Sequence, residues 1–372
     1  MRTQENPFTP SFGERPLHFA GRRKIIEAMA RAFEGERRRR PDLTTILSGA
    51  RGTGKTALLS LIANEAERRG WVTVATTAMP GMLEDVELGI RRKAAHLIDA
   101  SPSSARVSGI GIPQMVDVEF ERIPGPETSW RYRMSDLLEE LGSLGTGVLI
   151  TVDEVDPQLD EMIKLAATYQ HFVREERKVA LVMAGLPGSV SRLLGDKTVS
   201  FLRRAQTAPL GRIPDSEIAD ALRKTLREGG KDASADALLH AARSIGGFPF
   251  MMQLVGYLAW EARPESSELT VDDFDYGIAL AREEMRERVF EATYRDLSRG
   301  DAAFLEAMLE DGHESSVSDV ARRLGWSASQ ASQYRRRLMD AGVVGSRGLG
   351  VVAFELPFFR EFLVERIGGG EV

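Results

Sequence analysis

Short apolar runs alternate with segments of helical spacing over the first half of the chain. Five of these runs have the length of a buried strand, and the segments between them repeat apolar residues every three or four positions. The predicted strands are residues 44–48, 71–76, 148–152, 179–184 and 207–210. Because strands that alternate with helices favour a parallel sheet with crossover helices, residues 1–211 are predicted to form an α/β domain.

The pattern becomes purely helical after residue 211. Glycine pairs at Gly229-Gly230 and Gly246-Gly247 interrupt residues 212–297, which predicts a small helical lid after the sheet. Residues 298–372 then predict helix, helix, turn, helix and two short strands, the order of a winged helix-turn-helix. A further alternation over 110–120 favours a hairpin within an insertion at 100–130, whose role the pattern leaves open.

A glycine-rich loop joins the first predicted strand to the helical segment after it. Residues 49–56 match the pattern Gly-x-x-x-x-Gly-Lys-Ser/Thr in full, in the strand–loop–helix context of a P-loop. Its glycines let backbone N–H groups turn around phosphates at the positive end of a helix. We expect ATP or ADP here, with Lys55 at the β and γ phosphates and the Thr56 hydroxyl on Mg²⁺. The residues predicted to bind the nucleotide are Gly49, Ala50, Arg51, Gly52, Thr53, Gly54, Lys55, Thr56 and Ala57.

Two adjacent acids end the third predicted strand. In an ATP site of this kind, Asp153 would bind the nucleotide's Mg²⁺, and Glu154 would orient and deprotonate the attacking water. The other interpretation of these acids is an N-cap for the following helix. Behind a complete nucleotide loop the two acids favour ATP hydrolysis over binding alone, with Lys55 and Glu154 as catalytic residues.

An arginine pair precedes the last predicted strand. Phosphoryl transfer needs cations for the charge that develops on the γ phosphate, and a neighbouring subunit often supplies an arginine for this purpose. Arg203 and Arg204 would be exposed where such an arginine could act between subunits of a homo-oligomer. A solvated surface pair is the alternative, and the sequence does not decide between the two.

Three further segments carry a resemblance to a known family. They are Phe19-Ala20-Gly21-Arg22-Arg23, Ala184-Gly185-Leu186-Pro187 and Gly246-Gly247-Phe248-Pro249-Phe250. With the two nucleotide motifs, they resemble the AAA+ ATPases of the initiator (origin-recognition-like) and STAND branch over nearly the whole chain. The resemblance implies that Gly21 and Arg22 lie beside the adenine and that Pro249 is a neighbour of the nucleotide.

The chain departs from that family's pattern at two positions. Ala184 and Gly185 stand where many initiator-type members carry a polar sensor, and Phe250 stands where many carry an arginine after the lid proline. The usual polar link from the γ phosphate to the lid is therefore expected to be missing. We expect slow turnover, or a switch that distinguishes bound ATP from ADP, rather than a fast motor.

The C-terminal module carries a candidate surface for double-stranded DNA. Short polar groups and arginines on its second helix and wing suit base edges and phosphates. The predicted contacts are Ser329, Gln330, Gln333, Arg335, Arg336 and Arg347. From Gly300 onward, however, acids outnumber basic residues eleven to eight, so packing on protein is the alternative role. The run Arg37–Arg40 is expected to be a solvated helix end, or an addition to a DNA surface.

Composition narrows the class of protein further. A chain of 372 residues with 42% hydrophobic and 28% charged residues is expected to be soluble and to form two or three domains. The absence of cysteine excludes disulfides and thiolate zinc sites, and five scattered histidines show no metal-ligand spacing. Without an apolar signal region or membrane span, the chain is expected in the cytoplasm. Its net charge of −6 argues against coating nucleic acid indiscriminately.

These observations favour an ATP-dependent switch that acts on DNA through a winged helix. The rival hypothesis is a STAND-like signalling ATPase whose winged helix packs on the nucleotide domain without reading DNA. A helicase-loader or transposition-type ATPase shares the same motifs and stays open. Nucleotide-dependent homo-oligomers fit all three.

Overall fold

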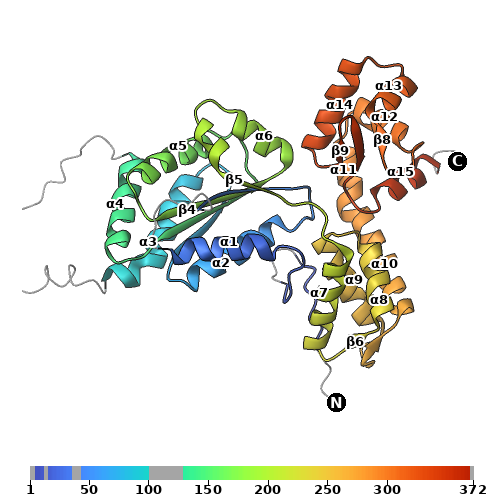
Figure 1. Cartoon of the computed structure of the whole chain (residues 1–372), viewed down its shortest axis with the longest axis horizontal. Helices are drawn as coiled ribbons and strands as arrows, with labels where there is room; N and C mark the ends of the chain where they lie inside the picture. The colour runs from blue at the N-terminus through green and yellow to red at the C-terminus, as the bar shows by residue number, and fades with distance from the viewer. Residues whose placement is uncertain (1–4, 12–15, 36–42, 100–128, 369–372) are drawn as a thin grey trace, which may run out of the picture.

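Five parallel strands form the central sheet of the protein, in the order β2-β3-β4-β1-β5 (Figure 1). The structure is a computed structural model that describes residues 5–11, 16–35, 43–99 and 129–368. The strands are β1 (Thr44–Ser48), β2 (Val72–Thr77), β3 (Val148–Asp153), β4 (Val179–Gly185) and β5 (Gln206–Pro209). Each predicted run is a strand whose ends differ from the prediction by at most one residue, so the predicted α/β fold is confirmed.

Helices cover both faces of this sheet. Helices α1 (Arg23–Glu34) and α2 (Lys55–Glu67) pack on one face, and α3 to α6 pack on the other. The bounds of the latter are α3 (Met82–Asp99), α4 (Trp130–Ser143), α5 (Asp160–Arg174) and α6 (Pro187–Gly195). Strand β4 is apolar throughout because both of its faces are buried. Val182 packs on the side of α1 and α2, while its neighbours Leu181 and Met183 pack on the side of α3 to α6.

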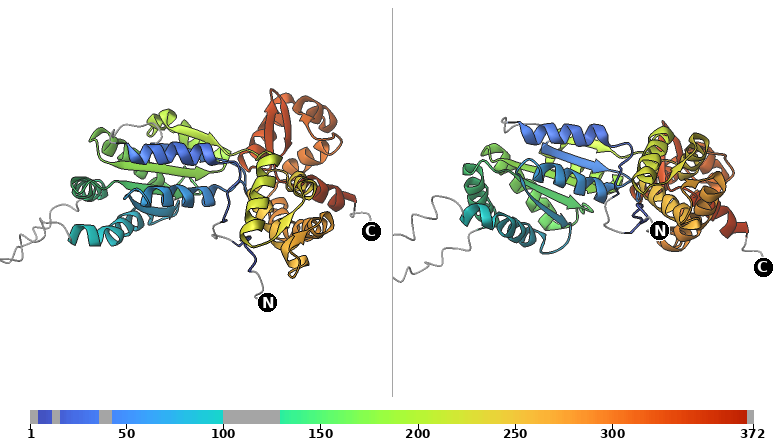
Figure 2. Two further views of the ribbon diagram at one scale, coloured as in Figure 1. Left: turned by 60° about the horizontal axis from the view of Figure 1, so that its bottom comes forward. Right: turned by 90° about the horizontal axis from the view of Figure 1, so that it is seen from below.

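The carboxyl ends of the parallel strands lie together at one edge of the sheet. In open α/β sheets this edge holds the ligand, beside the strands where the order reverses. In both views of Figure 2 the rest of the chain lies beside one end of the sheet and its helices. The loops after β1, β3 and β4 therefore set the candidate site.

A helical segment follows β5. Its helices are α7 (Asp215–Glu228), α8 (Ala235–Ile245), α9 (Pro249–Ala262) and α10 (Val271–Met285), with the short strands β6 (Asp232–Ala233) and β7 (Glu268–Leu269) paired beside them. Local signals set their ends: the Ser234 side chain accepts from Ala237 N, and Gly246 ends α8 at a φ of 66°. Thr270 and Asp273 form a capping box at the start of α10.

The C-terminal segment combines helices with a three-stranded antiparallel sheet in the order β8-β10-β9. After η4 (Arg286–Phe290) and α11 (Glu291–Arg295) come α12 (Arg299–Met308), β8 (Ser315–Ser316), α13 (Val317–Leu324) and α14 (Ala328–Asp340). Strands β9 (Val344–Gly348) and β10 (Val351–Phe354) and helix α15 (Phe359–Gly368) complete it. Ser327 caps α14, since its side chain accepts from Gln330 N.

One hydrophobic cluster runs through both the helical and the C-terminal segments. It extends from Ile213 to Leu363 and includes Phe8 from the start of the chain. Gly256 of α9 makes room for Phe8, since a Cβ there would lie 2.3 Å from the ring atom Cε1. The two segments therefore share a core, while the sheet and its helices have cores of their own.

Some sequence predictions fall on residues that the structure does not describe. The hairpin at 110–120 and the run Arg37–Arg40 lie outside the described residues. Among the described helices, none combines the length and apolar character needed to cross a bilayer.

Candidate functional site

The glycine-rich loop connects β1 to α2, and its conformation requires its glycines. Gly52 and Gly54 have φ values of 77° and 81°, in the left-handed region that glycine adopts without strain. A Cβ on Gly49 would lie 2.7 Å from Thr53 Oγ1, so this position also excludes a side chain. Helix α2 begins at Lys55, directly after the loop, so its free N–H groups and positive dipole end face the loop.

Lys55 lies folded over the loop. Its Nζ donates to Gly49 O at 3.0 Å and to Ala50 O at 2.8 Å. Burial lowers the pKa of Lys55, the nearby Asp153 carboxylate opposes that shift, and the Arg51 charge adds to it. The ammonium is thus held at the loop by carbonyl oxygens, which are weaker acceptors than the charged oxygens of a phosphate.

Thr56 and Asp153 come from different elements and meet directly. Thr56 Oγ1 donates to Asp153 Oδ2 at 2.5 Å, and Asp153 Oδ1 accepts from Glu154 N at 2.9 Å. A hydroxyl and a carboxylate placed together suit Mg²⁺, which binds hard oxygen donors and keeps several waters. The structure therefore brings together the two residues that the sequence predicts as metal ligands, and their oxygens fit that ion.

Glu154 stands in a strained backbone conformation at the end of β3. Its φ is 54°, which costs a side-chain-bearing residue about 1–2 kcal/mol, and its side chain is exposed. The N-cap interpretation of the two acids finds no support here, because α5 begins at Asp160 with Leu159 as its N-cap. Strain of this kind gathers at functional positions.

The end of β4 offers the site no polar side chain. Ala184 O accepts from Val155 N at 2.9 Å, and Gly185 O accepts from Gly49 N at 3.2 Å, so both residues serve the site through their backbone. A Cβ on Gly185 would lie 3.1 Å from Val155 Cβ. The apolar sensor position noted in the sequence is thus closely packed.

The predicted adenine-side residues lie at the linker between β5 and the helical segment. Gly21 has a φ of 70°, and a Cβ there would lie 2.6 Å from Ile213 Cγ2. Arg22 Nη2 donates to Gly211 O at 2.7 Å. Burial lowers the pKa of Arg22, and the Glu217 carboxylate opposes that shift. These contacts place Gly21 and Arg22 at the linker.

The turn before α9 lies against the nucleotide loop. A Cβ on Gly54 would lie 3.4 Å from Pro249 Cγ, and a Cβ on Gly52 would lie 3.8 Å from Phe248 Cδ1. Pro249, which the resemblance puts near the nucleotide, is therefore beside the loop. Phe250 packs against the core of the helical segment.

Arg203 and Arg204 are exposed on the 3₁₀ helix η3 (Ser200–Arg204). Arg203 Nε donates to Leu194 O at 2.9 Å, which anchors the side chain on α6. With Ser48 and Pro209, Arg203 lines an open cleft of about 510 Å³ between α6 and the sheet edge. A role for either arginine between subunits stays a prediction.

The C-terminal segment touches the nucleotide loop, and only the fold shows which of its residues do so. Gly342 follows α14 at a φ of 71°, and a Cβ on it would lie 3.3 Å from Ala50 Cα and 3.6 Å from Leu186 Cδ2. Two residues earlier, Asp340 fills the space beside Gly188, where a Cβ would lie 2.4 Å from Asp340 Cβ. Figure 1 shows α14 beside α6. We name this contact, formed by Ala50, Leu186, Gly188, Asp340 and Gly342, the α6–α14 contact.

The predicted DNA surface is only partly available in this arrangement. Ser329, Gln330, Gln333 and Arg336 are exposed, and Arg335 is half-buried. Arg347 of β9 pairs with Glu355 at 2.6 Å, and Arg337 of α14 pairs with Asp301 at 2.7 Å. Among the described contacts, no acid pairs with Arg335 or Arg336, so these two arginines carry what remains of the basic face.

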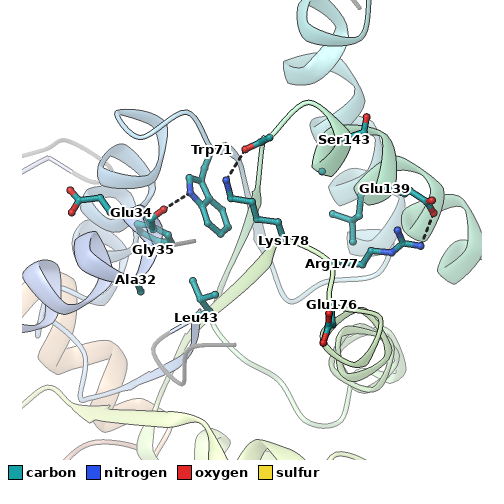
Figure 3. A pocket seen from close by; sticks show the side chains of 14 residues that line it. Ala32, Glu34, Gly35, Leu43, Trp71, Glu139, Ser143, Glu176, Arg177 and Lys178 are labelled. Atoms are coloured by element: carbon teal, nitrogen blue, oxygen red, sulfur yellow. Dashed lines mark hydrogen bonds and ion pairs between the residues drawn. The ribbon is translucent and has the colours of Figure 1, made fainter. Parts of the chain in front are cut away.

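A second cavity, of about 530 Å³, opens at the opposite edge of the sheet (Figure 3). Its indole N–H and its two cations already have hydrogen-bond or ion-pair partners. Trp71 Nε1 donates to Phe33 O at 3.1 Å, Lys178 Nζ donates to Gly145 O at 2.7 Å, and Arg177 pairs with Glu139. Because its cations are already bound, this cavity lacks free groups for a charged ligand, and the carboxyl edge is the candidate site.

Comparisons with known proteins agree with this geometry. Residues 18–183 match a family model described as an AAA ATPase domain, and residues 287–363 match one described as a domain of unknown function, DUF8462. No curated protein sequence matches the chain.

Solved structures extend the likeness to nearly the whole chain. The Walker-type ATPase PABY2304 of Pyrococcus abyssi is 15% identical, with a TM-score of 0.64 over 94% of this chain and 97% of that one. The ORC2 protein of Aeropyrum pernix in its ADP form is 14% identical, with a TM-score of 0.56 over 97% of each chain. At these identities the likeness shows the fold alone. Together these matches identify an AAA ATPase domain and a P-loop AAA+ fold.

Proposed function

We propose that this chain, which carries an AAA ATPase domain, is a slowly hydrolysing ATP-dependent switch whose nucleotide state sets the position of a DNA-binding winged helix. The observation that carries the proposal is the α6–α14 contact, where the Gly342 turn lies on Ala50 of the nucleotide loop. A change in this loop on ATP or ADP binding would reach α14 without any intermediate element. We divide the chain into an α/β nucleotide domain (1–211), a lid (212–297) and a winged helix (298–372).

ATP binding with Mg²⁺ rests on the loop and the residues that meet it. Residues Gly49 to Ala57 would hold the phosphates through backbone N–H groups and Lys55. Thr56 and Asp153 would hold Mg²⁺, which neutralises phosphate charge when bound. Gly21, Arg22 and Pro249 would enclose the nucleotide from the linker and lid side. Support also comes from the ORC2 protein of similar fold, which was solved with ADP.

Slow hydrolysis follows from which groups are present and which are absent. The exposed Glu154 lies next to Asp153, one of the two residues that would hold Mg²⁺, and would take a proton from the attacking water. The buried Ala184 and Gly185 offer no polar side chain to the γ phosphate, and Phe250 packs in the lid. A site with few groups that stabilise the transition state favours long-lived ATP and ADP states, as a switch requires.

The DNA part of the proposal rests on the order α12-β8-α13-α14-β9-β10, which is that of a winged helix. Helix α14 would be the recognition helix, with Ser329, Gln330 and Gln333 exposed for base edges. Because α6 packs on the carboxyl end of α14, full access to a DNA groove would require this contact to change. The nucleotide would thus control DNA access.

The same contact favours a second candidate function, the STAND-like signalling ATPase. In that case the winged helix stays on the nucleotide domain and acts through protein contacts. The ion pairs of Arg337 and Arg347 support it, because paired arginines contribute less to DNA affinity. DNA binding separates the two candidates.

Replacing both Arg335 and Arg336 by alanine is expected to weaken binding to duplex DNA and to flatten its salt dependence. Each lost phosphate contact lowers the slope of log K against log salt by about 1, so the pair should lower it by about 2. Fluorescence anisotropy with labelled duplex, in ATP and in ADP, measures both effects. The matched control replaces Arg288 and Arg295, two exposed arginines outside α14. If the unmodified chain binds no duplex at low salt with either nucleotide, the signalling function replaces the DNA function.

Gly188→Ala is expected to open the α6–α14 contact. The new Cβ would overlap Asp340, whereas alanine is a better helix former than glycine by up to about 1 kcal/mol, so α6 itself should not suffer. Hydrogen exchange in α14 should become faster and should no longer differ between ATP and ADP. Gly195→Ala in the same helix is the control, since a Cβ there meets nothing within 4 Å. An unchanged nucleotide effect in Gly188→Ala would contradict the proposed coupling.

A further inference from the structure

The candidate ATP site has few cations near the expected γ phosphate. Three arginines around it already donate hydrogen bonds to backbone carbonyls. Arg22 donates to Gly211 O at 2.7 Å, Arg203 to Leu194 O at 2.9 Å and Arg212 to Phe354 O at 3.1 Å. The end of β4 and the start of α9 add no charged side chain. Phosphoryl transfer still requires positive charge around the transferred oxygens.

Arg51 lies in the nucleotide loop itself, between two covered stretches. On one side, Ala50 lies beneath the Gly342 turn, and on the other side Gly54 lies beneath Pro249. Arg51 is exposed in between, and no described contact gives its side chain a partner. A charged side chain at the rim of the phosphate-binding loop is thus left free, with the lid and the C-terminal segment on either side.

The contacts of Ala50 place this part of the loop near the end of β4. Its neighbour Ala50 lies close to the Gly342 turn, which also approaches Leu186, directly after β4. The terminal phosphate of a nucleotide on this loop would lie over the ends of β3 and β4, because Asp153 and Thr56 hold the Mg²⁺ side there. Arg51 also lies close enough to Lys55 for its charge to act on that ammonium. The two like charges repel, and an anion between them would remove that repulsion.

We propose that Arg51 binds the terminal phosphate of ATP within its own chain, and so does the work expected of a polar sensor and a lid arginine, whose places Ala184, Gly185 and Phe250 take in this sequence. The inference rests on the proposed function of the loop as an ATP site. A guanidinium offers two parallel N–H donors that match two phosphate oxygens, and this fork suits a terminal phosphate better than a bridging one.

In the reaction, water attacks the γ phosphorus and the bond to the β–γ bridging oxygen breaks. Glu154 takes the proton of the water, ADP leaves with the bridging oxygen, and inorganic phosphate is the second product. Arg51 and Lys55 neutralise charge on the oxygens of the transferred group throughout. Since ADP lacks these oxygens, Arg51 distinguishes the two nucleotides, and its neighbour Ala50 lies in the α6–α14 contact.

The test compares ATP and ADP affinities of Arg51→Gln by calorimetry, in a Glu154→Gln background that keeps ATP intact. We expect ATP affinity to fall by about 10-fold or more, as for the loss of a charge-assisted pair, while ADP affinity stays nearly constant. Arg51→Lys keeps the charge but loses the two parallel N–H donors. Its ATP affinity should therefore lie between that of the parent chain and that of Arg51→Gln. Arg68→Gln, at the exposed far end of α2, is the matched control and should change neither affinity.

Two results would overturn the inference while leaving the loop as the proposed ATP site. One is an equal loss of ATP and ADP affinity in Arg51→Gln, and the other is no loss of either. If the parent chain binds neither nucleotide, the proposed function fails together with the inference. Thermal melting of each variant without nucleotide shows that the loop change has not unfolded the domain.

A mixing experiment tests whether Arg51 acts within its own chain. In an otherwise unmodified chain, Arg51→Gln should lower kcat by about 100-fold, the usual loss for one donor to a transition-state oxygen. Mixing this variant with Lys55→Ala should leave the rate low, because no single chain then holds both residues. Recovery of activity in the mixture would overturn the assignment to the same chain and make Arg51 act between subunits.

Discussion

Lys55→Ala is expected to abolish ATP and ADP binding at micromolar nucleotide. In the structure the Lys55 ammonium lies over the loop and donates to Gly49 O and Ala50 O. Phosphate oxygens would replace these carbonyls, and an ammonium binds a charged oxygen more strongly than a neutral one. Losing them should weaken binding by about 100-fold or more.

The measurement is equilibrium binding of a fluorescent ATP analogue, with unlabelled ATP and ADP as competitors. Lys24→Ala removes an exposed lysine from α1 of the same region and should bind as the unmodified chain does. Chelation of Mg²⁺ gives a second comparison. The ATP affinity of the unmodified chain should fall, because Thr56 and Asp153 act on the nucleotide through the ion. Undiminished ATP affinity in Lys55→Ala would show that the loop is not the nucleotide site.

The sheet could be predicted from the sequence because its strands are buried on both faces. Every residue of β4 is buried, so its apolar run marks the strand without reference to the rest of the chain. The same holds for the loop, where Gly52 and Gly54 adopt left-handed conformations that few other residues tolerate. Local constraints of this kind leave a direct record in the sequence.

The meeting of Thr56 with Asp153 could also be predicted, although the two residues lie 97 positions apart. Each belongs to a motif with its own local context, a loop before a helix and an acid after a strand. Because parallel strands place their carboxyl ends at one edge, two such motifs converge whenever the strands share a sheet. The pairing therefore follows from topology.

The α6–α14 contact could not be predicted in this way. Gly342 and Ala50 belong to opposite ends of the chain, and each has a sufficient local explanation, as a helix end and as a loop residue. The ion pair of Arg337 with Asp301 could not be predicted from the sequence either. A basic run in the sequence gives the charge of a helix, but only the fold shows which acids neutralise it.

These contacts give the nucleotide loop two neighbours whose core is separate from those of the sheet. The turn before α9 lies on Gly52 and Gly54, and the Gly342 turn lies on Ala50, so the loop is held from both sides. The helical segment and the C-terminal segment share one core, which makes a separate movement of either costly. We therefore expect a nucleotide-driven change to shift the two together against the sheet.

Glu154→Gln is expected to keep ATP binding while lowering the hydrolysis rate by about 100- to 10,000-fold. The amide has nearly the same shape as the carboxylate but cannot accept the proton of the attacking water. Phosphate release, measured under saturating ATP, gives the rate, and recovery of intact ATP from the protein shows that binding survives. A rate equal to that of the unmodified chain would remove Glu154 from the reaction.

Glu154→Gly separates the chemistry of this residue from its backbone strain. With a φ of 54°, Glu154 pays a conformational cost that glycine does not, so Glu154→Gly should raise the free energy of unfolding by up to about 1 kcal/mol while turnover is lost. Glu176, at a φ of 58° after α5, is the matched position. Glu176→Gly should give a similar gain in thermal melting with turnover intact. A gain of stability in both variants, with loss of hydrolysis only in Glu154→Gly, would show that the strained backbone at Glu154 serves to position its carboxylate.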